Sequence, residues 1–135
     1  MSEARRFTIA EANALVPRLE MLMERAQRVA LALRSALQDP ADSPPARTTA
    51  DVLRLRPDLA EQVRELESAV GAIEELGCLF KGLDLGLVDF PARVDGTTVL
   101  LCWQYGEKQI AYWHRADEGF ANRRALGAAE IPSLQ

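Results

Sequence analysis

The 135-residue sequence contains no apolar run of about 18 residues, the length that a membrane-spanning helix needs. Its first residues, MSEARRFTIAEAN, lack the apolar core of a secretory signal. Cysteine is scarce: only Cys78 and Cys102 occur. Without a secretory signal, reduced thiols are the simplest expectation, with a disulfide as the alternative. We therefore expect a cytoplasmic protein with no membrane partner.

Positive charge is not concentrated in any part of the sequence. The net charge is -4, and between residues 78 and 124 acidic side chains offset the basic ones. A nucleic-acid partner needs a dense basic surface that displaces counterions from phosphates, so none is expected. The chain also lacks a glycine-rich phosphate-binding loop.

Residues that commonly bind transition metals are few. One histidine and two distant cysteines match no zinc-binding spacing, so no metal site is predicted. A divalent ion such as Mg²⁺ or Mn²⁺ held by oxygen ligands is chemically allowed, although the sequence requires no cofactor. The candidate carboxylates for such an ion are Asp89, Glu107, Asp117 and Glu118.

The residues that are present predict a single α+β domain over residues 1–135. Apolar content is 48% and charged content 27%, as in ordinary globular proteins. A first helix is predicted over 8–37, because Thr8 and Glu11 can form a capping box and apolar residues then recur every three or four positions. Pro17 lies opposite this apolar stripe, so we expect one kinked helix rather than two.

A proline-rich connection is predicted over 38–56, with a helical turn over 51–56 as an option. A second helix then spans 57–77, where Gly77 can end it in a left-handed conformation. The two long helices should pack as an antiparallel hairpin. Further apolar residues beside the first stripe need cover, and these are Val16, Met23, Ala30 and Leu37. The sheet alone can supply that cover, but we favour a homodimer through the helices.

Residues 78–114 predict a three-stranded antiparallel sheet, a meander, followed by a C-terminal tail over 115–135. An Asp95–Gly96 turn would set the register of the first two strands, because both central positions of such a turn need positive φ. Val94 would then face Thr97, and the apolar pairs would be Ala92–Val99, Phe90–Leu101 and Val88–Trp103, with Asp89 opposite Cys102 on the other face. A second turn centred on Gly106–Glu107 would pair Trp103–Ile110, Leu101–Tyr112 and Val99–His114, and would place Trp113 on the face of Asp89.

Four polar residues are candidate catalytic groups: His114, Asp89, Glu107 and Asp117. A carboxylate among apolar neighbours can donate a proton or bind a ligand, and Asp89 can equally be a structural anchor. His114 can act as a general base oriented by Asp117, or be held by one structural hydrogen bond.

Three further residues are candidate ligand-binding groups. Trp103 and Trp113 can stack on a ligand, although tryptophans more often form part of the core. Arg123 can hold an anion, or be solvated.

The segments FTIAEANALVPRLEML, GLVDFPARVDG, LLCWQYGE, YWH and GFANRR together resemble the DUF2203 family of small uncharacterised bacterial proteins. The resemblance covers most of the chain and skips the proline-rich connection. It implies a helical hairpin followed by a small sheet and a bacterial cytoplasmic origin, and it implies no activity, substrate or cofactor. The polar positions typical of the family correspond to Asp89, Glu107, His114 and Arg123.

We therefore expect a non-catalytic dimeric binding or interaction module whose partner is a small molecule or a protein. The alternative is a small hydrolase-like or metal-assisted enzyme with a site around Asp89, Glu107 and His114.

Overall fold

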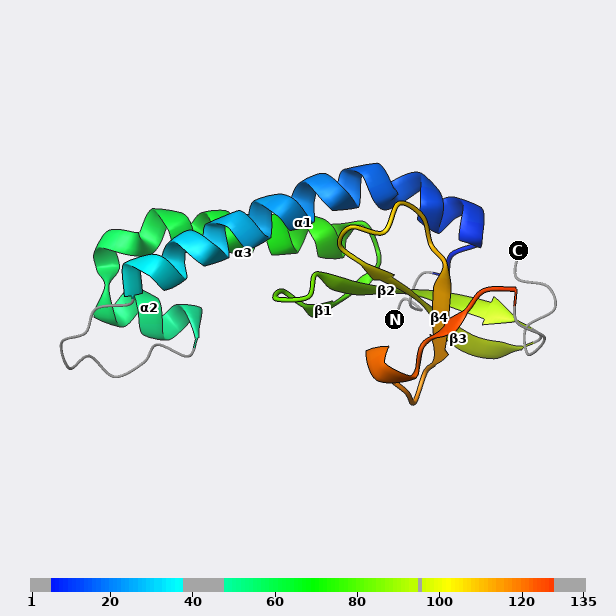
Figure 1. Cartoon of the computed structure of the whole chain (residues 1–135). Helices are drawn as coiled ribbons and strands as arrows, with labels where there is room; N and C mark the ends of the chain where they lie inside the picture. Colours follow the sequence, from blue (N-terminus) through cyan, green and yellow to red (C-terminus); the bar gives the residue numbers. More distant parts are fainter. Residues whose placement is uncertain (1–5, 38–47, 95, 128–135) are drawn as a thin grey trace.

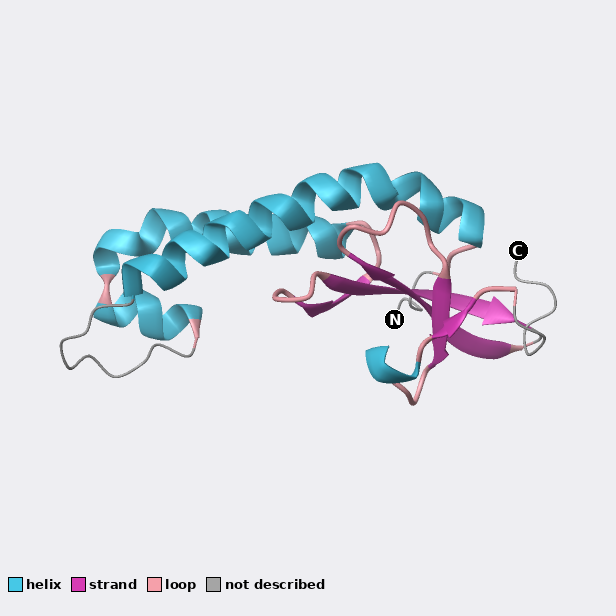
Figure 2. Ribbon diagram, viewed as in Figure 1, coloured by secondary structure: helices cyan, strands magenta, loops and turns pink. Residues whose placement is uncertain are grey.

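The computed structural model describes residues 6–37, 48–94 and 96–127, and shows helices followed by an antiparallel sheet (Figures 1 and 2). The helices are α1 (Ile9–Leu37), α2 (Thr49–Leu55) and α3 (Ala60–Glu75), with short 3-10 helices η1 (Pro57–Leu59) and η2 (Phe120–Asn122). The strands are β1 (Leu79–Gly82), β2 (Leu87–Val94), β3 (Thr97–Gln104), β4 (Tyr112–Arg115) and β5 (Arg124–Ala125). None of the helices described is long and apolar enough to cross a bilayer.

The capping box predicted at the start of α1 is confirmed. The backbone N–H of Thr8 donates to Glu11 Oε1 at 2.9 Å, and the N–H of Glu11 donates to Thr8 Oγ1 at 3.0 Å. Two backbone donors that the first helical turn leaves unpaired are thereby satisfied. The helix then continues through Pro17, which is exposed.

Helices α1 and α3 lie side by side and run in opposite directions (Figure 1). The connection between them contains α2 and η1, so the simple hairpin is found only in part; residues 38–47 of the proline-rich connection lie outside the described part. Beyond the sheet, the helices share an apolar cluster of Val29, Leu33, Val52, Leu59 and Val63. Gly77, at φ 101°, follows the end of α3, as its permissive backbone predicted.

The sheet has five strands in the order β1-β2-β3-β4-β5, so the prediction of three strands is wrong. The additional strands are β1 and β5, which pair with β2 and β4 respectively. β1 has four residues and β5 has two, which is too short for an alternating apolar pattern to stand out.

The register predicted between β2 and β3 is confirmed. Phe90 lies opposite Leu101 and Val88 opposite Trp103, while Asp89 lies opposite Cys102. One face of these strands packs against the helices, and the buried core there comprises Phe7, Ala12, Val16, Leu19, Met23, Ile73, Cys78, Val88, Phe90, Ala92, Val99, Leu101, Trp103, Ile110 and Trp113. We call the opposite side, which carries Asp89 and Cys102, the outer face.

The register predicted for β4 is wrong by one residue. His114 lies opposite Leu100, not Val99, and Trp113 lies opposite Leu101. A tight turn forms one residue earlier than expected, with the N–H of Glu107 donating to the carbonyl of Gln104 at 3.0 Å. A one-residue shift exchanges the two faces of a strand, so Trp113 joins the core and His114 lies on the outer face.

The segment between this turn and β4 is held by the first helix. Asn13 on α1 accepts a hydrogen bond from the N–H of Ile110 through Oδ1 at 2.6 Å. Trp103 Nε1 donates to the carbonyl of Glu107 at 2.9 Å. These contacts let residues 105–111 leave the β-ladder, so a count of residues across a symmetric hairpin could not find the register of β4.

The loop between β1 and β2 is docked on the same helix. Gln27 Nε2 donates to the carbonyl of Leu83 at 3.0 Å, and Arg34 pairs with Asp84. Gly86 follows at φ +67°, and an added Cβ would lie 2.6 Å from Cβ of Tyr105. Only glycine fits this crossing without displacing its neighbours.

Candidate functional site

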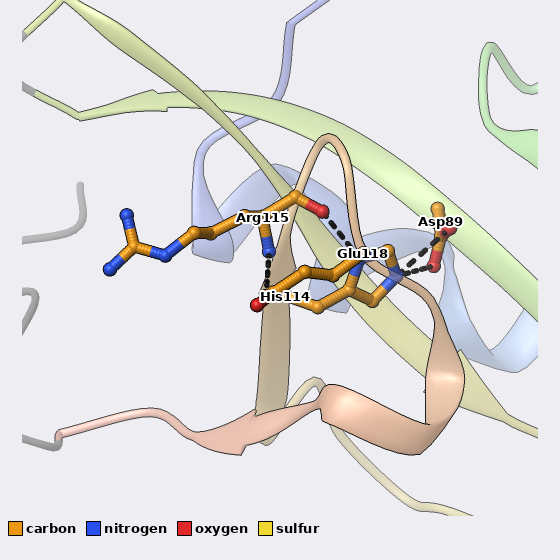
Figure 3. Close-up of polar contacts among 4 residues, drawn as sticks. All are labelled: Asp89, His114, Arg115 and Glu118. Carbon is orange, nitrogen blue, oxygen red and sulfur yellow. Dashed lines mark hydrogen bonds and ion pairs between the residues drawn. The ribbon is translucent and has the colours of Figure 1, made fainter.

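The outer face brings together Asp89 of β2 and His114 of β4. His114 Nε2 lies 3.2 Å from Oδ1 and 3.1 Å from Oδ2 of Asp89. The imidazole reaches across the intervening strand β3 toward the carboxylate (Figure 3). The side chains of His114 and Asp89 are only 2% and 4% exposed, so they interact in a weakly screened environment.

A backbone contact determines which ring nitrogen of His114 carries hydrogen. Nδ1 lies 2.8 Å from the carbonyl oxygen of Arg115 (Figure 3). Because that oxygen can only accept, Nδ1 must be the donor. In the neutral imidazole the lone pair of Nε2 then faces the Asp89 carboxylate. Two acceptors at this distance require a proton or another cation between them.

Cys102 of β3 completes the cluster on the outer face. One ligand atom from each of Asp89, Cys102 and His114 lies within 4.8 Å of the others, and all three residues are buried. Burial, and after it the charge of Asp89, raise the pKa of the Cys102 thiol to about 12, while the charge of Arg123 acts in the opposite direction. The thiolate fraction at pH 7 is about 10⁻⁵ at such a pKa, so an uncoordinated Cys102 is a poor nucleophile.

A pocket of about 290 Å³ opens onto these three residues. Its other lining residues come from the strand β1, the start of β2 and the segment after β4, and are Lys81, Leu87, Glu118, Gly119 and Phe120. The pocket therefore combines a cation and carboxylates with an apolar rim, a composition common in small-ligand sites.

Glu118 stabilises the segment that forms the rim of the pocket. Its carboxylate accepts hydrogen bonds from Arg124 Nη1 and Nη2 at 2.8 and 3.0 Å. It also accepts one from the N–H of Arg115 at 3.0 Å, which Figure 3 shows. These hydrogen bonds, those from Arg124 foremost, hold the pKa of Glu118 at about 2. This residue of the pocket lining is therefore charged at neutral pH.

Glu107 and Arg123, both predicted site residues, form an ion pair next to the pocket rather than in its lining. Arg123 Nη2 lies 2.9 Å from Glu107 Oε2, and Glu107 Oε1 accepts from the N–H of Gln104 at 2.8 Å. The Arg123 guanidinium lies over the rings of Tyr112 and Phe120, at 4.0 and 4.5 Å from their centroids. Its Nη1 is buried without a nitrogen or oxygen partner among the described residues.

The remaining predicted residues lie away from the pocket. Trp103 and Trp113 are buried in the core between the sheet and the helices. The guanidinium groups of Arg115 and Arg124 lie 5.9 and 5.0 Å from the Trp113 ring centroid. Asp117 is exposed and does not line the pocket, whereas its neighbour Glu118 does.

Sequence reasoning did not select Cys102 or Lys81 as site residues, and it named Glu118 only as one possible carboxylate for a divalent ion. Cys102 could have been found, because the register predicted from an Asp95–Gly96 turn already placed it opposite Asp89; the pairing is observed, while Asp95 itself lies outside the described residues. No local pattern signals Lys81, because the strand that carries it was not predicted. Both cysteines are reduced and buried, in agreement with the simplest expectation.

Comparison with known proteins identifies a family and no characterised homologue. A search of curated proteins and a search of solved structures each return no match. The family model described as "Uncharacterized conserved protein (DUF2203)" matches residues 5–126, which is most of the chain and includes every residue that lines the pocket. The chain therefore belongs to the DUF2203 family.

Proposed function

We propose that the protein is a small binding module whose outer-face pocket holds a polar ligand against the Asp89–His114 pair. The supporting observation is that this pair is buried and yet forms part of the wall of the 290 Å³ pocket. Removing two ionisable groups from water costs several kcal/mol per ion, and well-packed apolar residues often stabilise a fold as well or better. Stability alone is therefore a weak explanation for the pair.

The single histidine provides a direct test. Because His114 is the only histidine, its imidazole gives one set of ring signals in an NMR spectrum. The probes are inorganic phosphate and small mono- and dicarboxylates, which can pair with Lys81 beside the imidazole. Saturable shifts of the ring signals support the proposal, and unchanged signals across the panel at millimolar concentration refute it for this ligand class.

Two glycines provide a blocked variant and its control. Gly119 lines the pocket and has no atom within 4 Å of an added Cβ, so Gly119→Trp should obstruct ligand entry without a clash at Cβ. Gly71 on α3 has equally open surroundings and lies away from this pocket, so Gly71→Trp is the matched control. A ligand that binds both variants equally does not occupy the pocket.

A small hydrolase-like or metal-assisted enzyme is the second candidate function. The observation that favours it is the cluster of Asp89, Cys102 and His114, which combines a carboxylate, a thiol and an imidazole beside a pocket. Hydrolysis of p-nitrophenyl acetate and p-nitrophenyl phosphate, with and without added Zn²⁺, tests it. Turnover that His114→Gln abolishes while the protein stays folded would favour the enzyme over the binding module.

We also propose that the chain forms a homodimer through its helices. Met21 and Leu31 of α1 are 65% and 61% exposed and leave apolar surface for a partner. The positions Val16, Met23 and Ala30, which prompted this expectation, are already buried within one chain, so the interface would use the exposed residues instead. Light scattering at micromolar concentration is decisive, because a species of 14.9 kDa would exclude the dimer.

A further inference from the structure

We propose that Asp89, Cys102 and His114 together bind one transition-metal ion, with Zn²⁺ as the best-matched ion. This inference rests on the proposed ligand-binding role of the pocket and names a resident ion for it. Three strands contribute one ligand each: β2 a carboxylate oxygen, β3 a thiol sulfur and β4 an imidazole nitrogen. Because the ligands are distant in sequence, the spacing rules that reveal zinc sites do not detect them.

The hydrogen bonds of His114 favour a metal ligand. The Nδ1–H group donates to the carbonyl of Arg115 at 2.8 Å, which leaves Nε2 as the free lone pair. Histidines that bind metals usually donate their other N–H to a backbone carbonyl or carboxylate in this way. The lone pair faces both oxygens of Asp89 at 3.1–3.2 Å. A bound cation would accept electron density from all of these acceptors and remove their mutual repulsion.

The spacing of the three ligand atoms fits a small coordination sphere. In a tetrahedral Zn²⁺ site with bonds of about 2.0–2.3 Å, neighbouring ligand atoms are roughly 3.3–3.8 Å apart. Here the three atoms lie within 4.8 Å of one another, and the nitrogen–oxygen pair is already at 3.1 Å. In such a site the sulfur lies about 3.5 Å from the nitrogen and the oxygen, so an approach of the Cys102 sulfur by up to about 1.3 Å completes the three-ligand geometry.

The chemistry of the ligand set selects the class of metal. A thiolate and an imidazole suit Zn²⁺ and chemically similar ions such as Co²⁺, whereas Mg²⁺ and Ca²⁺ prefer oxygen ligands throughout. Coordination replaces the thiol proton and the proton shared by Asp89 and His114 with the metal, releases both to solvent and requires no oxidant or reductant. The bound ion with one carboxylate and one thiolate carries no net charge, which suits a buried position. The three ligands line the same pocket as Lys81, so a small ligand in that pocket could supply a fourth donor atom.

Cobalt titration of the full-length chain, after treatment with a chelator, tests the inference. We expect one Co²⁺ per chain, visible bands of tetrahedral Co²⁺, a near-ultraviolet sulfur-to-cobalt charge-transfer band, and displacement of Co²⁺ by Zn²⁺. Cys102→Ser should lose the charge-transfer band. Cys78→Ser is the matched control and should keep it, because Cys78 is also buried and reduced but lies in the core outside the cluster.

The absence of saturable Co²⁺ binding to the folded wild-type chain would overturn the inference, as would loss of the charge-transfer band in Cys78→Ser alone. If Cys102→Ser does not fold, wild-type protein supplies the same information: in dilute urea, Zn²⁺ should slow alkylation of Cys102 more than that of Cys78, and equal rates would contradict the inference. A chain that binds no metal while phosphate or carboxylates still shift the His114 signals would lose only the metal site. If phosphate and carboxylates leave the His114 signals unchanged both with metal bound and with metal removed, the proposed small-ligand function is refuted separately from the metal site.

Discussion

Replacement of Asp89 should reveal how His114 is protonated. Asp89→Ala leaves the buried Nε2 of His114 without a partner, and breaking a buried pair in this way costs about 3–5 kcal/mol of unfolding free energy. Asp89→Asn should be much milder. Its amide can donate to Nε2 across the observed 3.1 Å while Nδ1 keeps its hydrogen bond to Arg115, so we expect a loss of only about 1–1.5 kcal/mol.

Urea denaturation at pH 7 in the presence of a chelator measures these differences, with the fluorescence of the two buried tryptophans as the signal. With a slope of about 2 kcal/mol per molar urea, Asp89→Ala should lower the midpoint by roughly 2 M. The matched control is Asp84→Ala, which removes an ion pair with Arg34 whose side chains are 76% and 55% exposed. Such exposed pairs contribute about 0–1 kcal/mol.

Two results would refute this reasoning. If Asp89→Ala costs no more than Asp84→Ala, the pair does not behave as a buried interaction. If Asp89→Asn is as damaging as Asp89→Ala, a hydrogen-bond donor at this position does not satisfy Nε2, and the hydrogen assigned to Nδ1 is wrong. A double-mutant cycle with His114→Ala separates the coupling within the pair from the cost of each truncation.

Three further predictions follow from single features of the structure. The pKa of Glu118 is about 2 in the folded chain against an ordinary 4.5, so its contribution to the unfolding free energy is present above about pH 4.5 and is lost as the pH falls toward 2. The difference in urea midpoint between wild type and Glu118→Gln should therefore shrink between pH 4.5 and pH 2, and a constant difference would contradict the prediction. Burial raises the pKa of the Cys102 thiol from 9.0 to about 12, so the thiol ionises in the unfolded chain first, and wild type should lose stability relative to Cys102→Ser as the pH rises from 9. The thiol of the folded chain should also resist alkylation; equal pH profiles of stability or rapid labelling of the folded chain would contradict this. Gly86→Ala should lower the thermal midpoint more than Gly96→Ala, because only at Gly86 does the new Cβ meet Tyr105, at 2.6 Å. Both glycines have positive φ, which costs alanine about 1–2 kcal/mol at either position, so equal losses would contradict the close approach.

Local chemistry made part of this fold predictable. Both the capping box of α1 and the β2–β3 register were predicted from residues close together in sequence. These residues are Thr8 and Glu11 for the capping box, and Gly96 with the residue before it for the register. Such signals act over a few residues and do not need the rest of the chain. β1 and β5 were missed because their pairing depends on longer strands beside them and not on any pattern of their own.

The candidate site was only partly predictable, because its residues converge from several segments. Asp89 and His114 were selected individually as polar residues in strands, yet their contact required the correct register of β4. Lys81 and Glu118 reach the same pocket from the edge strand β1 and from the turn after β4. No spacing rule relates such positions, since irregular segments separate them and the length of such a segment does not fix the strand register.

The register of β4 links the helical layer to the candidate site on the opposite side of the sheet. Shifted by one residue, β4 would place the His114 imidazole in the apolar core and Trp113 on the outer face, with a polar group buried where apolar neighbours offer no partner. The observed register is supported by the contact between Asn13 of α1 and the backbone of Ile110, just before β4 begins. The turn after β3 alone does not determine it, because residues 105–111 lie outside the ladder. Packing of α1 against this segment thus supports the register in which His114 meets Asp89, although α1, α2 and α3 contribute no side chain to the pocket lining.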